Sequence, residues 1–175
     1  MSEIDPLKYP VGLFLKPEAI TAEHLTAWIA TIAEFPQKIA ALTETLTEET
    51  LTKTYRPDGW TIRQLVHHCA DSHMNAFIRF KLALTEEAPK IKPYFEDQWA
   101  ELPDTRSAAI SSSLKLIEGL HARWVTLLQS LHSEDLNREY IHPEHGKRFS
   151  LGETIGMYAW HCEHHLAHIA IALKN

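Results

Sequence analysis

The sequence predicts an all-α protein: one four-helix bundle over residues 1–175, preceded within that domain by an irregular amino-terminal arm. Four long segments repeat apolar residues at helical spacing, and no run alternates as a strand does. Two of these segments open with the pattern of a capping box, in which a Ser or Thr is followed three residues later by Gln or Glu. With 175 residues, 45% of them hydrophobic and 23% charged, the chain has the size and composition of one globular domain.

The first 20 residues contain three prolines and little periodicity, which predicts an arm lying on the domain surface. The side chains expected to dock it are Tyr9, Val11, Leu13 and Phe14. Thr21 is the expected N-cap of the first helix, which continues to Leu46. Pro36 should start a new turn or kink this helix, because proline lacks the N–H that a helix interior uses.

The second helix has the strongest start in the chain. Thr61 and Gln64 form a capping box, and the helical pattern then continues to about Leu84. Residues 86–103 contain three prolines and predict a long connection. Connections of this length usually carry function or cover another part of the protein.

The second half of the chain repeats this plan. A third helix is predicted from Ser107 to Leu131, and a connection from Glu139 to Arg148. Ser150 and Glu153 form a second capping box, opening a last helix that ends near Leu173.

The repeat is visible in the residues themselves. Residues 46–55 resemble residues 131–140, and each segment is followed by a loop, an aromatic residue and a capping box. Two related helix pairs predict a four-helix bundle.

Composition excludes several functions. The net charge is -6 without a Lys and Arg cluster, which argues against nucleic-acid binding. The chain has no basic, apolar leader and no run near the ~20 apolar residues of a membrane span, so we expect a cytoplasmic protein. Cys69 and Cys162 fall in helical patterns, which predicts core side chains and not a disulfide framework.

Residues 160–168 read WHCEHHLAH and contain four of the 12 histidines. His161 and His165 are four residues apart and can place two imidazoles on one ion, as can His164 and His168. The apolar stripe of this helix has His165 at its border with His161 beside it, whereas the other pair lies toward the expected solvent side. Metal sites of bundles use core-facing side chains, which favours His161 and His165.

A catalytic metal site usually has three protein ligands and one position for water or substrate. The second helix offers His67, His68 and His73 as the third ligand. The helical wheel favours His73, which lies in the middle of the apolar stripe, but the pattern alone leaves the choice open.

Three stretches carry a resemblance to a known family: GWTIRQLVHHCADSHMN (59–75), IRFKLALTEE (78–87) and YAWHCEHHLAH (158–168). The sequence resembles the DinB superfamily and its YfiT-type branch, described as metal-dependent hydrolases and as bacillithiol transferases. In that family one metal-binding histidine precedes an apolar residue, Ala and Asp, and two more form His-x-x-x-His on the last helix. By position these are His68, His161 and His165. Cys69 stands where the branch commonly has Leu.

The resemblance implies a divalent ion, Zn²⁺ or Ni²⁺, held by these three histidines, and a homodimer. Such an ion lowers the pKa of a bound water or thiol. The expected activity is therefore hydrolysis, or transfer of a thiol such as bacillithiol onto a small electrophile. The alternative is a non-catalytic helical binding module with a structural metal, which would show four protein ligands and unfold without the ion. We expect no binding site for an organic cofactor.

Neighbouring polar residues have weaker expectations. Asp71 follows His68 by three residues and either orients a ligand or is a solvated surface charge. Glu163 and His67 are expected in solvent. His73, His164 and His168 are expected to line the pocket or to hydrogen-bond the ligands. No role is expected for His24, His121, His132, His142 and His145.

Overall fold

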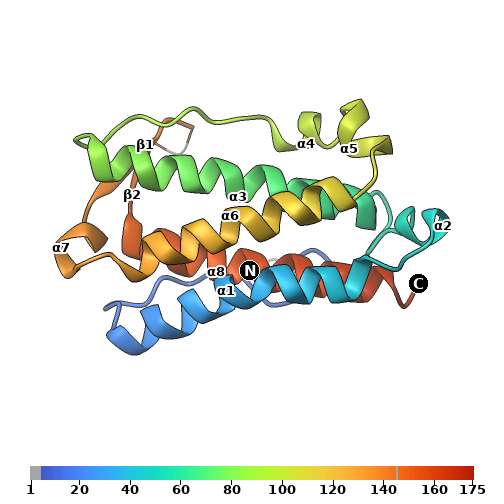
Figure 1. Ribbon diagram of the computed structural model, residues 1–175, viewed down its shortest axis with the longest axis horizontal. Coiled ribbons are helices and arrows are strands. Elements are labelled where there is room, and N and C mark those ends of the chain that lie inside the picture. Colours follow the sequence, from blue (N-terminus) through green and yellow to red (C-terminus); the bar gives the residue numbers. More distant parts are fainter. Residues whose placement is uncertain (1–4, 145) are drawn as a thin grey trace.

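Four long helices build the fold in the computed structural model, which describes residues 5–144 and 146–175. They are α1 (Ala22–Thr43), α3 (Ile62–Thr85), α6 (Ser111–Gln129) and α8 (Leu151–Ala172). The connections contain α2 (Glu48–Leu51), α4 (Glu96–Trp99), α5 (Pro103–Ser107) and α7 (Ser133–Leu136). Figure 1 shows the long helices lying side by side along one axis, which confirms the predicted bundle.

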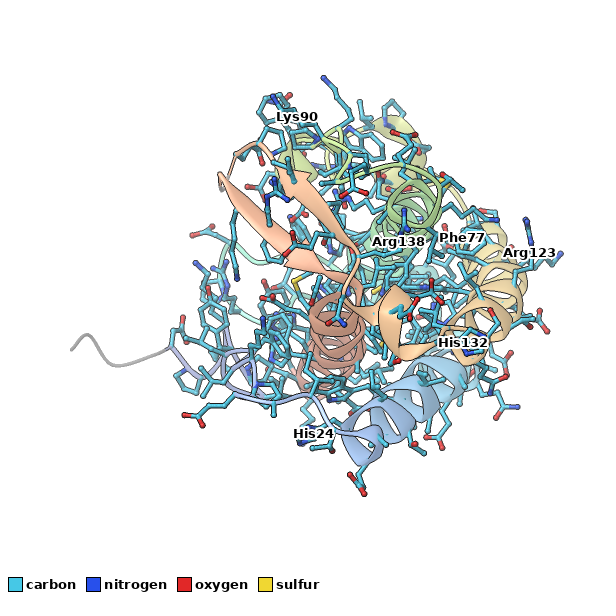
Figure 2. The ribbon with its side chains drawn as sticks, turned by 90° about the vertical axis from the view of Figure 1, so that its left-hand side faces the viewer. His24, Phe77, Lys90, Arg123, His132 and Arg138 are labelled. Atoms are coloured by element: carbon cyan, nitrogen blue, oxygen red, sulfur yellow. The ribbon has the colours of Figure 1, made fainter. Side chains whose placement is uncertain are left out.

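The long helices form a square in the end-on view of Figure 2. α1 and α3 each pack mainly against α6 and α8, so helices that follow one another, α1 and α3 or α6 and α8, lie on the diagonals. In a simple up-down-up-down bundle consecutive helices are neighbours. In Figure 1 α3 and α8 run in opposite directions, which places the start of α3 beside the later turns of α8.

The predicted capping box of α3 is confirmed in both halves. Thr61 Oγ1 accepts from the Gln64 N–H at 3.2 Å, and Gln64 Oε1 accepts from the Thr61 N–H at 2.9 Å. In α8 Ser150 Oγ accepts from the Glu153 N–H at 3.1 Å. The Glu153 carboxylate instead pairs with Lys16 and Lys147, so the second half of that box is absent.

Two helix boundaries differ from the prediction. α1 continues through Pro36 and does not restart there. The third helix, predicted from Ser107, begins at Ser111 as α6, because Ser107 ends the short helix α5 and Ala108 after it has extended backbone angles.

The connection predicted at residues 139–148 contains a hairpin that the sequence did not indicate. β1 (Glu139–His142) pairs antiparallel with β2 (Lys147–Ser150). Strands of four residues are too short to show a recognisable alternation. Ile141 also exchanges backbone hydrogen bonds with Pro89 O and the Ile91 N–H, which fixes the 86–103 connection beside the hairpin.

The arm is held at fewer points than expected. Tyr9 and Phe14 are partly buried, but Val11 and Leu13 are exposed, so the prediction that they dock the arm is wrong. Cys69 and Cys162 are buried free thiols, as predicted for core side chains. Across the described residues, no helix is both long and apolar enough to span a membrane.

Replacing Thr61 with Ala should destabilise the fold, because the Gln64 N–H at the buried start of α3 loses its acceptor. We expect a loss of about 1 kcal/mol in the free energy of unfolding, measured by urea denaturation. Thr126→Ala, on the exposed face of α6, is the matched control and should change little. Equal stabilities of both variants would contradict the cap assignment.

Candidate metal centre

Three histidine nitrogens converge between α3 and α8. His68 lies in the second turn of α3, and His161 and His165 lie on successive turns of α8. The Nε2 atom of His161 is 3.3 Å from Nε2 of His68 and 3.2 Å from Nε2 of His165. The antiparallel packing of the two helices brings together residues 93 positions apart.

This donor set fits a divalent ion. A tetrahedral ion with metal–nitrogen bonds of 2.0–2.1 Å separates its ligand nitrogens by about 3.3 Å. In the described part of the chain, no further His, Cys or carboxylate joins the group formed by His68, His161 and His165. All three line a pocket of about 540 Å³, so a fourth position would face space for water or substrate.

The protonation states suit metal binding. Burial, together with the nearby His164 and His168, lowers the pKa of His68 to about 3. Burial also holds the pKa values of His161 and His165 well below the usual value. Neutral imidazoles offer the lone pair that a metal needs, so these three residues are ready to bind near neutral pH.

A chain of hydrogen bonds fixes the tautomer of His161. Its Nδ1 lies 3.0 Å from Nε2 of His73, and Nδ1 of His73 lies 2.8 Å from Nε2 of His121. Nδ1 of His121 lies 2.7 Å from the carbonyl oxygen of Ile32. A carbonyl only accepts, so each neutral ring in turn donates from Nδ1 and accepts at Nε2. The chain leaves the His161 Nε2 lone pair facing the other two ligands.

Pro36 explains the free carbonyl at the end of this chain. In a helix each N–H bonds to the carbonyl four residues earlier, and Pro36 has no N–H to offer Ile32. His121 supplies that hydrogen bond from α6. No role was predicted for His121, but its place between Ile117 and Trp124 on the apolar stripe of α6 is a sequence signal of burial.

A shorter chain orients His165. Nδ1 of His165 lies 3.4 Å from Nδ1 of His168, whose Nε2 lies 3.3 Å from the carbonyl oxygen of Lys8. The Lys8 carbonyl only accepts, so His168 donates to it from Nε2 and its Nδ1 is an acceptor. His165 therefore donates from Nδ1 to His168, and Nε2 of His165 stays free for a metal. His164, His165 and His168 also cluster, but both His168 nitrogens are used in this way.

The prediction that His164 and His168 lie on the solvent side is wrong. They are 7% and 2% exposed, because the amino-terminal arm crosses that face of α8. The Tyr9 ring lies beside His164, and the Trp160 Nε1–H donates to the Gly12 carbonyl at 3.0 Å. The arm therefore forms one wall of the site.

Of the remaining candidate residues, one contacts a ligand histidine and the others lie apart from the three ligands. His73, which the helical wheel favoured as a ligand, contacts His161 from behind. His67, expected in solvent, is buried and bonds to Ser113 Oγ at 2.7 Å and to the Ala108 carbonyl at 3.2 Å. Glu163 is exposed near Lys38, as predicted.

Among the described residues, the Asp71 carboxylate does not join the group formed by the three ligands. Burial, and the nearby Asp104 carboxylate, raise the pKa of Asp71 to about 6. The hydrogen bonds found among described residues include none between its carboxylate and a ligand histidine. His142 lines the pocket, His24 caps α1, His132 caps α7, and His145 lies outside the described residues.

The fold and site define a helical-bundle protein with an open three-histidine centre. The chain belongs to the DinB superfamily, whose family model matches residues 31–169. It is 52% identical over 169 residues to a Bacillus pumilus protein, covering 97% of this chain and 96% of that one. A Bacillus cereus relative is 49% identical over 172 residues, with 98% of each chain covered. Both relatives are named "Putative metal-dependent hydrolase".

A solved structure agrees with the fold. YfiT from Bacillus subtilis superposes with a TM-score of 0.92 at 44% identity, covering 95% of each chain. It is described as a probable metal-dependent hydrolase with an unusual four-helix bundle topology.

His121→Phe should weaken zinc binding, because His73 then loses its acceptor and His161 loses the support that fixes its tautomer. We expect the zinc affinity to fall about 10- to 100-fold, measured by competition with a chromophoric chelator. His132→Phe, at the exposed N-cap position of α7, is the control and should bind like the unmodified protein. Unchanged zinc affinity in a folded His121→Phe protein would show that the hydrogen bonds through His73 and His121 do not orient His161.

Asp71→Asn should raise the thermal unfolding midpoint at pH 7.5. The folded-state pKa of Asp71, about 6, exceeds its ordinary value of 3.8, so folding is opposed by ionisation of this carboxyl. The loss of stability is complete when the pH is well above 6 and disappears when the pH falls below 3.8. The gain over the unmodified protein should therefore shrink toward zero at pH 4. Melting curves at both pH values test this, with exposed Glu118→Gln as the control. A gain that persists at pH 4 would contradict it.

Proposed function

We propose that the protein is a metal-dependent hydrolase in which His68, His161 and His165 hold one divalent ion, Zn²⁺ or Ni²⁺. The observation that carries this proposal is the convergence of three Nε2 atoms at the wall of a pocket. The Nε2 atom of His161 lies 3.3 Å from that of His68 and 3.2 Å from that of His165. The names of the relatives support the same assignment. A structural ion would instead take a fourth protein ligand, and no described residue supplies one.

A bound divalent ion supplies Lewis acidity, which lowers the pKa of water or of a thiol at the vacant position. The three neutral imidazoles leave the charge of the ion uncompensated, which favours an anionic fourth ligand. Ser72 Oγ lies 3.5 Å from Nε2 of His161, at the edge of the group. Tyr55, Trp60 and Trp160 line the pocket around the site and limit access of bulk water.

Transfer of a low-molecular-weight thiol, with bacillithiol as co-substrate, is the second candidate. The observation that favours it is that the three-histidine group contains no carboxylate among described residues. Hydrolysis is helped by a general base beside the attacking water. A thiol has an ordinary pKa near 8.5 and ionises at such a centre without that help. Both candidates act on small electrophilic molecules that fit the pocket.

His165→Ala should lose the bound metal and the activity while the bundle stays folded, because this ring lines the pocket. Metal content by mass spectrometry, ester hydrolysis and thiol conjugation to a chromogenic electrophile should be measured with Zn²⁺ and with Ni²⁺. Exposed Glu163→Gln, two residues away, is the control and should keep both properties.

Two results would argue against this assignment. Full activity in His165→Ala would exclude the three-histidine centre. Unfolding of the unmodified protein on metal removal would favour the alternative, a helical binding module with a structural ion.

A further inference from the structure

Arg79 is a buried cation without a protein partner. Its side chain projects from the third quarter of α3 and is 9% exposed. No hydrogen bond or ion pair joins its guanidinium to any other described residue. Arg63, by comparison, is similarly buried but bonds to Glu48 and to the Ala108 carbonyl. A guanidinium without a protein partner at the wall of a pocket is stabilised by an anion, so Arg79 is available to bind a negatively charged group from outside the chain.

Arg79 shares one face of α3 with the metal site. His68, Ser72 and Arg79 are spaced at i, i+4 and i+11, which places them within about 40° around the helix. All three line the 540 Å³ pocket, and Arg79 also lines an adjoining cavity of about 430 Å³. Eleven residues rise about 16 Å along a helix, and the Arg79 side chain leans back toward the start of α3. One extended small molecule can therefore reach both sites.

A second unsatisfied donor lies beside Arg79. The hydroxyl of Tyr94 is buried without a hydrogen-bond partner and its residue lines the adjoining cavity. Tyr94 and Arg79 line the same cavity. Burial raises the pKa of Tyr94, and the Arg79 charge acts in the opposite direction. Ser72 is near enough to lower this pKa as well, but it does not form a hydrogen bond with Tyr94 that meets the usual geometry.

The surroundings select the kind of anion. A guanidinium fork and a phenol hydroxyl match the oxygens of a carboxylate or a phosphate. Glu96 and Asp97 are exposed at the rim of the same cavity, and their charges oppose a phosphate, which carries two charges on one group, more than a carboxylate group, which carries one.

We propose that Arg79 and Tyr94 bind a carboxylate group of the substrate and so align its reactive part with the three-histidine site. Alignment of the reactive part with the three-histidine site rests on the proposed function, whereas binding of the carboxylate to Arg79 and Tyr94 does not. The substrate class is then a small carboxylic acid derivative that extends along α3 for two to three helical turns.

Binding of glutarate and of inorganic phosphate, each titrated into the ¹⁵N-labelled protein, tests this subsite without any reaction. The arginine Nε–H signals in the NMR spectrum report the contact directly. Glutarate should shift the Arg79 signal, and Arg79→Gln should raise its dissociation constant about tenfold or more. Tyr94→Phe should weaken binding by a smaller factor. Arg123→Gln, on the outer side of α6 in Figure 2, is the matched control and should bind normally.

His68→Ala separates this proposal from the metal-centre proposal, because glutarate should still bind to it. Equal glutarate binding by Arg79→Gln and the unmodified protein, or no shift of the Arg79 signal, would overturn the subsite. Tighter Arg79-dependent binding of phosphate than of glutarate would overturn the choice of a carboxylate.

Discussion

The antiparallel contact of α3 with α8 is the constraint on which the rest of the structure depends. It sets the second turn of α3 against the middle of α8 and brings His68 to within 3.3 Å of His161. The diagonal connections of the bundle make these two helices neighbours although α6 lies between them in sequence. The hairpin, the arm and the 86–103 connection then enclose the outer side of the contact as a pocket.

Burying imidazoles is unfavourable unless their nitrogens are paired, and the fold pairs the Nδ1 atoms of His161, His73, His121 and His165 and both nitrogens of His168 in a directed way. Two chains of hydrogen bonds end on backbone carbonyls, one at Ile32 and one at Lys8. Each chain points the Nε2 lone pair of an α8 histidine at the same place. The first depends on Pro36 in α1, and the second on the position of the arm, so distant segments determine the chemistry of the site.

The sequence predicted the helices well where capping residues mark their ends, as at Thr61, and predicted His161 and His165 from the stripe of α8. His68 came only from the family resemblance, because α3 is buried against α5, α6 and α8 and its stripe does not select one face. The burial of His164 and His168 depends on the arm, which lies more than 140 residues away in sequence. Burial of a helix face by a segment distant in sequence cannot be predicted from the periodicity of that helix alone.

X-ray absorption spectroscopy of the protein loaded with one equivalent of Zn²⁺ tests the central claim most directly. The account predicts three imidazole nitrogens and one further light atom at 2.0–2.1 Å from the ion, with no sulfur neighbour. A sulfur at about 2.3 Å would place Cys69 or Cys162 in the coordination sphere and contradict the assignment. Failure to retain a stoichiometric ion would contradict it as well.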